Sequence, residues 1–298
     1  MKKIAIILVF MFLIFYPVDA VELNTNYQIR MVLRDYDKAL KKQDINKIKD
    51  FYTEDYKDSD GFTLDESVSM FEKMYNAYDN VKQKTKINSI TSFDNYVVVQ
   101  LMDTTNAAIN PQKDLFRKNA QRKTLPQIIR EKRIIKEKQG KLESKSIYSL
   151  YFKKIGDKWK IFYDDITAET TSLKYGAANK VKMQLNAPAF IEGGENYDLS
   201  LKIDKSDDLF AVASLSNEEI LYPTPEYKEK FRKLPSKGEL ERIVRANSNK
   251  KNECAVASVG LTKISINELQ AKARIELVGM ALLIKRINMI DSKDMNEK

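Results

Sequence analysis

The sequence predicts an α+β fold, in which a cone of three helices on a curved antiparallel sheet is followed by a mainly-β, sandwich-like domain. Apolar residues recur at helical spacing only in the first third of the chain. Beyond it, short runs rich in Val, Ile and Thr are separated by clusters of Gly, Pro, Asn and Asp. Helices first and strands after them are typical of α+β chains.

The chain opens with a pattern typical of an export signal. Lys2 and Lys3 precede an uninterrupted apolar run, 4–16, and small residues end at Ala20. The run is short for a membrane anchor, which is the rival interpretation, because crossing a bilayer takes about 20 apolar residues. We therefore expect residues 1–20 to be a cleaved signal peptide and the protein to be periplasmic or extracellular.

The composition excludes most familiar catalytic chemistry. The chain contains no histidine and one cysteine, Cys254. It therefore has no Ser-His-Asp triad, no Cys-His pair and no histidine metal ligand. No Gly-rich phosphate loop or CxxC motif is present, so we expect no cofactor. Cys254 is expected to be a small apolar residue at the start of a strand.

Three helices are predicted before the first strands. Apolar residues between 29 and 40 form the stripe of an amphipathic first helix. Asp44 is a plausible N-cap for a second helix, 45–52. Thr63 and Glu66 have the spacing of a capping box at the start of a third helix.

The period then changes to that of strands. The runs 86–92 and 96–104 are separated by a polar turn. A second hairpin is predicted from strands 146–154 and 158–166, joined by the turn 155–157, with aromatic and aliphatic residues alternating on one face of each strand.

Three segments resemble the nuclear transport factor two-like superfamily, which includes polyketide-cyclase-like and ketosteroid-isomerase-like enzymes. They are ALKKQD at 39–44, FYTEDY at 51–56 and YFKKIGDKWKI at 151–161. The resemblance covers about residues 25–170. It implies a conical pocket between the helices and the sheet, and an aspartate general base in the isomerase-like members, which commonly pair it with His or Tyr. The long basic insertion before the final hairpin departs from the usual pattern.

The whole layout resembles a family of exported bacterial proteins that carry this fold and a β-domain behind it, which implies an architecture and no activity. The expected divisions are a signal peptide at 1–20, the α+β domain at 21–170 with an insertion at 105–143, a linker at 171–179, a β-sandwich-like domain at 180–291 and a polar tail at 292–298. Ser236 and Glu239 also match a capping box, which predicts a helix to about Ala246.

Positive charge is concentrated in the insertion. The formal net charge is +9, and the stretch 113–141 alone holds eleven basic and three acidic residues. Anionic lipid headgroups or an acidic envelope polymer are the expected partners, through Lys132, Arg133, Lys136 and Lys138. Nucleic acid is not expected, since one aromatic residue in the stretch serves base stacking poorly. The alternative is a solvated insertion without a partner.

Candidate site residues follow from the predicted pocket. An apolar ligand would contact Tyr36, Tyr75, Met102 and Trp159, whereas Asp103, Asp165, Tyr151 and Tyr163 are candidates for an Asp/Tyr pair in catalysis. Because aromatic residues also dominate ordinary cores, the alternative is that they only pack together. The parity of the strands decides which carboxylate faces inward, and the sequence leaves it open.

An acidic stretch around Gly61 suggests calcium at first sight. With Gly61 at position 6 of an EF-hand loop, Asp58 and Asp60 fall correctly, but Tyr56 and Ser67 occupy the outer ligand positions. An EF-hand is therefore excluded. A looser calcium site is the alternative to a solvated turn that places negative charge at the start of the third helix, and we expect the turn and no metal.

The absent histidine and the confined positive charge favour an exported binding or scaffold protein without catalysis. Its ligand would be a small apolar molecule or another protein. The alternative is an exported isomerase-, cyclase- or hydrolase-type enzyme with an Asp/Tyr pair. A third option is association, for example a homodimer through the N-terminal sheet.

Overall fold

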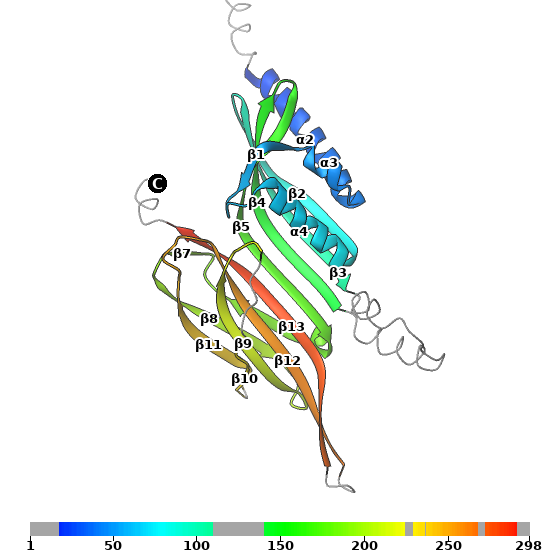
Figure 1. Ribbon diagram of the computed structural model, residues 1–298, viewed down its shortest axis with the longest axis vertical. Helices are drawn as coiled ribbons and strands as arrows, with labels where there is room; N and C mark the ends of the chain where they lie inside the picture. Colours follow the sequence, from blue (N-terminus) through cyan, green and yellow to red (C-terminus); the bar gives the residue numbers. More distant parts are fainter. Residues whose placement is uncertain (1–17, 110–139, 224–228, 236, 268–271, 291–298) are drawn as a thin grey trace, which may run out of the picture.

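The computed structural model describes residues 18–109, 140–223, 229–235, 237–267 and 272–290 (Figure 1). Most of the expected signal peptide, the four basic residues of the insertion singled out above and the polar tail lie outside the described residues. Among the residues that are described, no helix is long and apolar enough to cross a membrane.

The N-terminal part contains the expected helices and one strand that was not expected. The elements are α2 (Val18–Lys42), α3 (Ile45–Lys49), β1 (Tyr52–Asp58) and α4 (Leu64–Ala77). The caps predicted for the second and third helices are confirmed. The Asp44 side chain accepts the backbone N–H of Lys47 at 3.1 Å, and the backbone N–H of Thr63 donates to the Glu66 carboxylate at 2.8 Å. The second helix stops at Lys49 because Tyr52 already pairs with Ile161 of the sheet.

The remainder of the described chain is almost entirely strand. The elements are β2 (Asp79–Phe93), β3 (Tyr96–Ile109), β4 (Gly140–Ile155), β5 (Lys158–Gly176), the short 3₁₀-helix η1 (Ala177–Lys180), β6 (Lys182–Asn186), β7 (Phe190–Glu192), β8 (Asn196–Asp204), β9 (Phe210–Glu219), β10 (Arg232–Lys233), β11 (Glu239–Arg245), β12 (Glu253–Asn267) and β13 (Lys272–Ile290).

One large, mainly antiparallel sheet organises these strands except β6, β8 and β11, which form a small second sheet. Eight of its ten strands follow the order β10-β9-β12-β13-β5-β4-β3-β2, with β1 beside β5 and β7 beside β13. The fold is mostly β, so the prediction of an α+β cone followed by a β-domain is wrong. The reason is β5: it runs through much of the expected linker, and its residues Thr171 and Leu173 pair with Ile284 and Leu282 of β13.

The predicted helix at 236–246 is also wrong. Residues Glu239–Arg245 form β11, which pairs with β8 in the small sheet β11-β8-β6. The side chains of Leu240 and Val244 pack into the core at even spacing, with Ala246 continuing the pattern. A two-residue period with burial on one face stabilises a strand, and it overrides the local capping pattern.

The two ends of the large sheet are covered on opposite faces. Leu282, Leu173, Leu142 and Ala107 form one row across β13, β5, β4 and β3. The neighbouring row, which starts at Leu283, faces the other way, because successive side chains of a strand alternate between faces. The row with Ala107 shares the face that α2 and α4 cover, and the row with Leu283 shares the face under the small sheet (Figure 1).

Each covered face has its own core. The N-terminal core is rich in aromatic side chains and packs α2, α3 and β1 on the sheet. The C-terminal core is built from small and aliphatic residues of β8, β9, β12 and β13, including Leu199, Leu201, Ala257 and Leu261. A buried ion pair links the two parts: the Arg286 guanidinium in β13 donates to both Asp60 oxygens, in the β1–α4 loop, at 2.7 and 2.8 Å.

Candidate ligand-binding groove

A groove of about 480 Å³ lies between α2 and the edge of the sheet. Its lining comes from α2 and from strands β2, β3 and β4: Arg30, Leu33, Arg34, Tyr36, Asp37, Leu40, Lys41, Gln83, Lys84, Thr85, Ile87, Leu101 and Tyr148. The size is within the range of small-molecule sites. The α2 residues that line it recur every three or four positions, so one helix face forms a whole wall.

Asp103 lies directly behind the sheet-side lining. It is only 6% exposed, and both of its hydrogen-bond donors, Gln83 and Tyr148, line the groove. The Tyr148 hydroxyl donates to Asp103 Oδ2 at 3.1 Å, and the Gln83 amide donates to the same oxygen. Asp103 Oδ1 is buried and accepts no hydrogen bond from the described residues.

Burial decides the ionisation of this site. Removal of the Asp103 carboxyl from water raises its pKa, while its contacts with Gln83, Thr85 and Tyr148 oppose the rise. Burial also raises the pKa of Tyr148, which stays a hydrogen-bond donor at neutral pH. A carboxyl with one free oxygen and a raised pKa can accept or share a proton with a bound group.

A column of tyrosines continues from the groove into the core. The hydroxyls of Tyr36 and Tyr52 are 2.6 Å apart, and the rings of Tyr52 and Tyr56 meet edge to face at 4.7 Å. Tyr56 donates to Asp164 at 2.8 Å. Burial raises the pKa of Asp164 to about 7, and the negative charges of nearby aspartates, Asp58 first, add to the rise.

The structure separates the predicted catalytic candidates. Asp103 pairs with Ser146 of β4 and is two residues from buried Leu101 on β3. Since side chains two residues apart on a strand share a face, Asp103 lies on the helix-covered face. Asp165 pairs with Ser149 on the opposite face. Tyr151 and Tyr163 are also away from the groove, in edge-to-face contact with each other at 5.2 Å. Neither predicted tyrosine is a hydrogen-bond partner of Asp103.

Of the predicted ligand contacts, only Tyr36 lines the groove. Met102 alternates with Leu101 and Asp103, so it faces away. Tyr75 donates to the backbone carbonyl of Leu40 at 3.3 Å, which joins α4 to α2, and burial raises its pKa to about 12. Trp159 is buried, and its indole N–H donates to Gln28 at 2.9 Å, which anchors α2 on the sheet.

Three functional residues of this region were not predicted: Gln83, Tyr148 and Asp164. A signal for Tyr148 was present, because it shares a two-residue spacing with Leu150 and Phe152 on one face of the hairpin. Val97, Val99, Leu101 and Asp103 are likewise two residues apart along β3, so the four side chains share one face. Gln83 and Asp164 follow only from the pairing of strands, which no local pattern contains.

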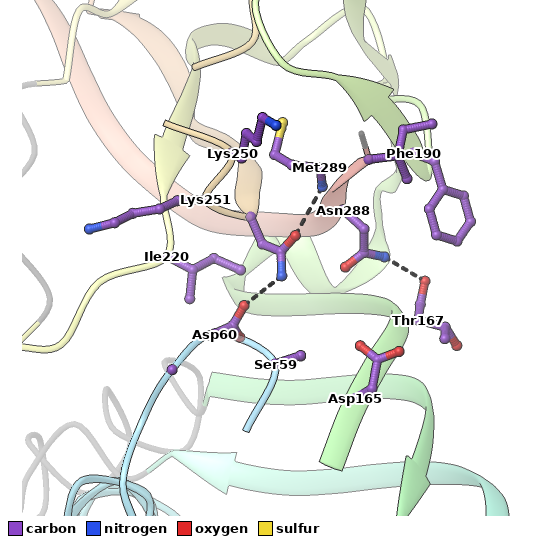
Figure 2. Close-up of a pocket in the computed structure, with 13 residues that line it drawn as sticks. Ser59, Asp60, Asp165, Thr167, Phe190, Ile220, Lys250, Lys251, Asn288 and Met289 are labelled. Carbon is purple, nitrogen blue, oxygen red and sulfur yellow. Dashed lines mark hydrogen bonds between the residues drawn. The ribbon is translucent and has the colours of Figure 1, made fainter. Parts of the chain in front are cut away.

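A second pocket, of about 490 Å³, lies where the two parts of the sheet meet (Figure 2). Its walls include Asp165 and Phe190, with Lys250 and Lys251 across from them. Several of its polar groups already have protein partners. Asn252 donates to Asp60 at 2.8 Å and accepts the backbone N–H of Met289, and Asn288 donates to the Thr167 carbonyl. This pocket is therefore part of the junction between the two parts.

The acidic stretch serves the same junction. Asp60 is paired with Arg286, and Asp58 accepts the backbone N–H groups of Asp60 and Phe62 at 3.0 and 2.8 Å. In the part of the chain that the structure describes, no group of three or more acidic, His or Cys side chains could hold a metal ion. Cys254 lies at the start of β12 as predicted, and burial raises the pKa of its thiol to about 12.

No family model and no curated protein matches the chain. Among solved structures, Bd1075 of Bdellovibrio bacteriovorus is 16% identical over 47% of this chain, which spans 39% of that protein, with a TM-score of 0.33. A Novosphingobium aromaticivorans protein proposed to be a scytalone dehydratase is 12% identical, covers 50% of this chain and 87% of its own, and has a TM-score of 0.35. A conserved protein of Planctomyces limnophilus is 12% identical to this chain. The match covers 48% of this chain and 94% of that protein, with a TM-score of 0.33.

Those identities and scores say nothing about the activity of this chain. The resemblance of residues 25–170 to the nuclear transport factor two-like superfamily therefore remains a prediction from the quoted segments. What the groove can do follows from its own geometry.

Proposed function

We propose that this chain is an exported binding protein without catalysis, and that it holds a small ligand in the groove beside α2. The observation that carries the proposal is Asp103. A buried carboxyl with an unpartnered oxygen lowers stability, and groups that lower stability in this way are concentrated at functional sites. It lies behind an apolar groove, against two side chains that line that groove. A few polar groups behind an apolar lining are typical of small-molecule sites.

The experiment is native mass spectrometry of the mature protein purified from its own host without denaturant. We expect a mass increment from a co-purifying small molecule. Thr85→Trp should remove the increment, because a large ring in the lining fills the groove. The matched control is Thr91→Trp, an exposed threonine of the same strand that pairs with Val98 outside the groove. An apo mass for the wild type, together with no uptake of added apolar probes, contradicts the proposal.

A second candidate function is acid–base catalysis in the same groove. The contact that favours it is the 3.1 Å hydrogen bond between Asp103 and Tyr148, which is within the reach expected of a working pair. In this alternative Asp103 would abstract a proton from an apolar substrate, as an isomerase- or cyclase-type enzyme does. Once the ligand is known, its conversion by the wild type and not by Asp103→Asn would establish catalysis, and its unchanged release would exclude it.

A further inference from the structure

The lining of the groove divides by chemistry. Its floor is apolar or aromatic, and its members are Leu33, Tyr36, Leu40, Ile87, Leu101 and Tyr148. Its charged residues are Arg30, Arg34, Asp37, Lys41 and Lys84. Four cations and one anion around an apolar floor produce a positive potential at the mouth of the groove.

The charges on α2 are not equally compensated. Lys41 is paired with Asp37 one helical turn away. Arg34 lies 3.5 Å from Asp35, but the carboxylate of Asp35 is closer to Lys38, at 2.9 Å. Arg30 has no ion pair among the described residues. Lys84, on β2, also has no ion pair among the described residues. The uncompensated positive charge of the lining therefore lies with Lys84 and with the two arginines, which stand together on α2.

Arg30 and Arg34 are four positions apart on one face of α2. Like charges at this spacing repel each other and destabilise a helix. A bound anion would relieve the repulsion and replace it with charge-assisted hydrogen bonds. The guanidinium group offers two parallel N–H donors, which match the two oxygens of a carboxylate or phosphate.

Asp103 sets the orientation of such a ligand. Its carboxyl is behind the sheet side of the groove, so a negative group that entered on that side would be repelled whenever Asp103 is ionised. The negative group of the ligand therefore binds beside Arg30 and Arg34 instead. Only the apolar part of the ligand can cover Leu33 and Leu101 without leaving a charge desolvated.

We propose that the ligand of this groove is an amphipathic anion of the long-chain carboxylic acid class. Its carboxylate lies between Arg30 and Arg34, and its hydrocarbon chain lies on the floor of the groove. This inference rests on the binding function proposed above and names the class of its ligand.

The test is calorimetric titration of the mature protein with three probes of equal chain length, below their micelle-forming concentrations: decanoate, decanol and decyltrimethylammonium. We expect decanoate to bind at least about tenfold more tightly than decanol, since charge-assisted hydrogen bonds separate the two. Its affinity should fall with added salt, because the arginines are at the surface. Decyltrimethylammonium should bind most weakly.

The double variant Arg30→Gln/Arg34→Gln should bring decanoate to the affinity of decanol and leave decanol unchanged. The matched control is Lys42→Gln/Lys47→Gln, which removes two charges, one each from α2 and α3, that do not line the groove. The inference is overturned if the wild type binds decanoate and decanol equally, or if the control variant loses as much decanoate affinity as the arginine variant. In either case the binding function still stands. If none of the three probes binds, the binding function itself fails, and the inference fails with it.

Discussion

The two ends of the sheet treat buried polar groups differently. Five buried side-chain oxygens lack a hydrogen-bond partner among the described residues, and all belong to the N-terminal part: Thr53, Ser59, Ser67, Ser92 and Asp103. In the C-terminal part, buried Glu253 accepts four hydrogen bonds, from Tyr197, Asn217 and twice from Asn247. The contrast appears within one continuous sheet.

We interpret the difference as one between a part that only stabilises the fold and the part that we propose binds a ligand. A buried polar group with all its partners holds neighbouring segments in one arrangement, as Glu253 does for β8, β9 and the turn before β12. A buried group that lacks a protein partner lowers stability, and among the five such groups Asp103 is the one whose hydrogen-bond donors line the groove. This comparison, rather than any sequence motif, directs attention to the groove.

The largest effect is expected at the contact that joins the two parts. Asp60→Ala leaves the Arg286 guanidinium buried without its anion, and breaking a buried pair in this way costs about 3–5 kcal/mol. We expect a loss of that order in the free energy of unfolding, measured by urea denaturation. Lys263→Ala, which breaks an exposed pair with Asp208 in the C-terminal part, is the control and should cost less than about 1 kcal/mol. Equal losses would show that the junction is not specially dependent on its ion pair.

Sequence reasoning found the three N-terminal helices, the caps of the second and third of them, and the two hairpins, because these depend on residues close together in the chain. It missed the single sheet, because the pairing of Leu173 with Leu282 joins segments a hundred residues apart. Local composition around Tyr175 and Gly176 looks like a linker, yet these residues are held in place by Met280 and Gly279 of β13.

The candidate site, like the fold, was only partly predictable from the sequence. Asp103 was among the candidates, because the superfamily resemblance implies an aspartate general base, but the sequence did not decide between Asp103 and Asp165. Its partner was predicted as Tyr151 or Tyr163 and is Tyr148, because β3 and β4 pair without a break in register: Tyr148 lies beside Leu101 on the helix-covered face, whereas Tyr151 alternates to the opposite face.

A smaller effect is expected from pH, through Asp164. Its pKa in the folded protein is raised to about 7, above the ordinary 3.8, so the folded state retains a proton that the unfolded chain releases. This contribution to stability is complete below about pH 4 and is lost as the pH rises through about 7. Each unit of raised pKa corresponds to about 1.4 kcal/mol, so the change is a few kcal/mol at most.

Asp164→Asn keeps the hydrogen bond from Tyr56 and removes the charge. We expect the variant to be more stable than the wild type at about pH 8 and to show a weaker fall in stability between about pH 4 and pH 8. The measurement is urea denaturation across that range. Asp94→Asn, in the exposed turn between β2 and β3, controls for the loss of one carboxylate. Parallel pH curves for Asp164→Asn and the wild type would refute the prediction.

The smallest effects test the comparison most directly, by the same isosteric change in each part. Glu253→Gln places an amide NH₂ against donors that converge on both carboxylate oxygens, so we expect a loss of about 1–3 kcal/mol in the free energy of unfolding. Asp103→Asn meets no such conflict. Both donors reach one oxygen, which the amide carbonyl can replace, and a desolvated negative charge disappears. The free energy of unfolding should then stay within about 0.5 kcal/mol of the wild type or rise. Equal destabilisation by the two substitutions would mean that Asp103 is a structural group like Glu253, and that the groove is only a surface of the core.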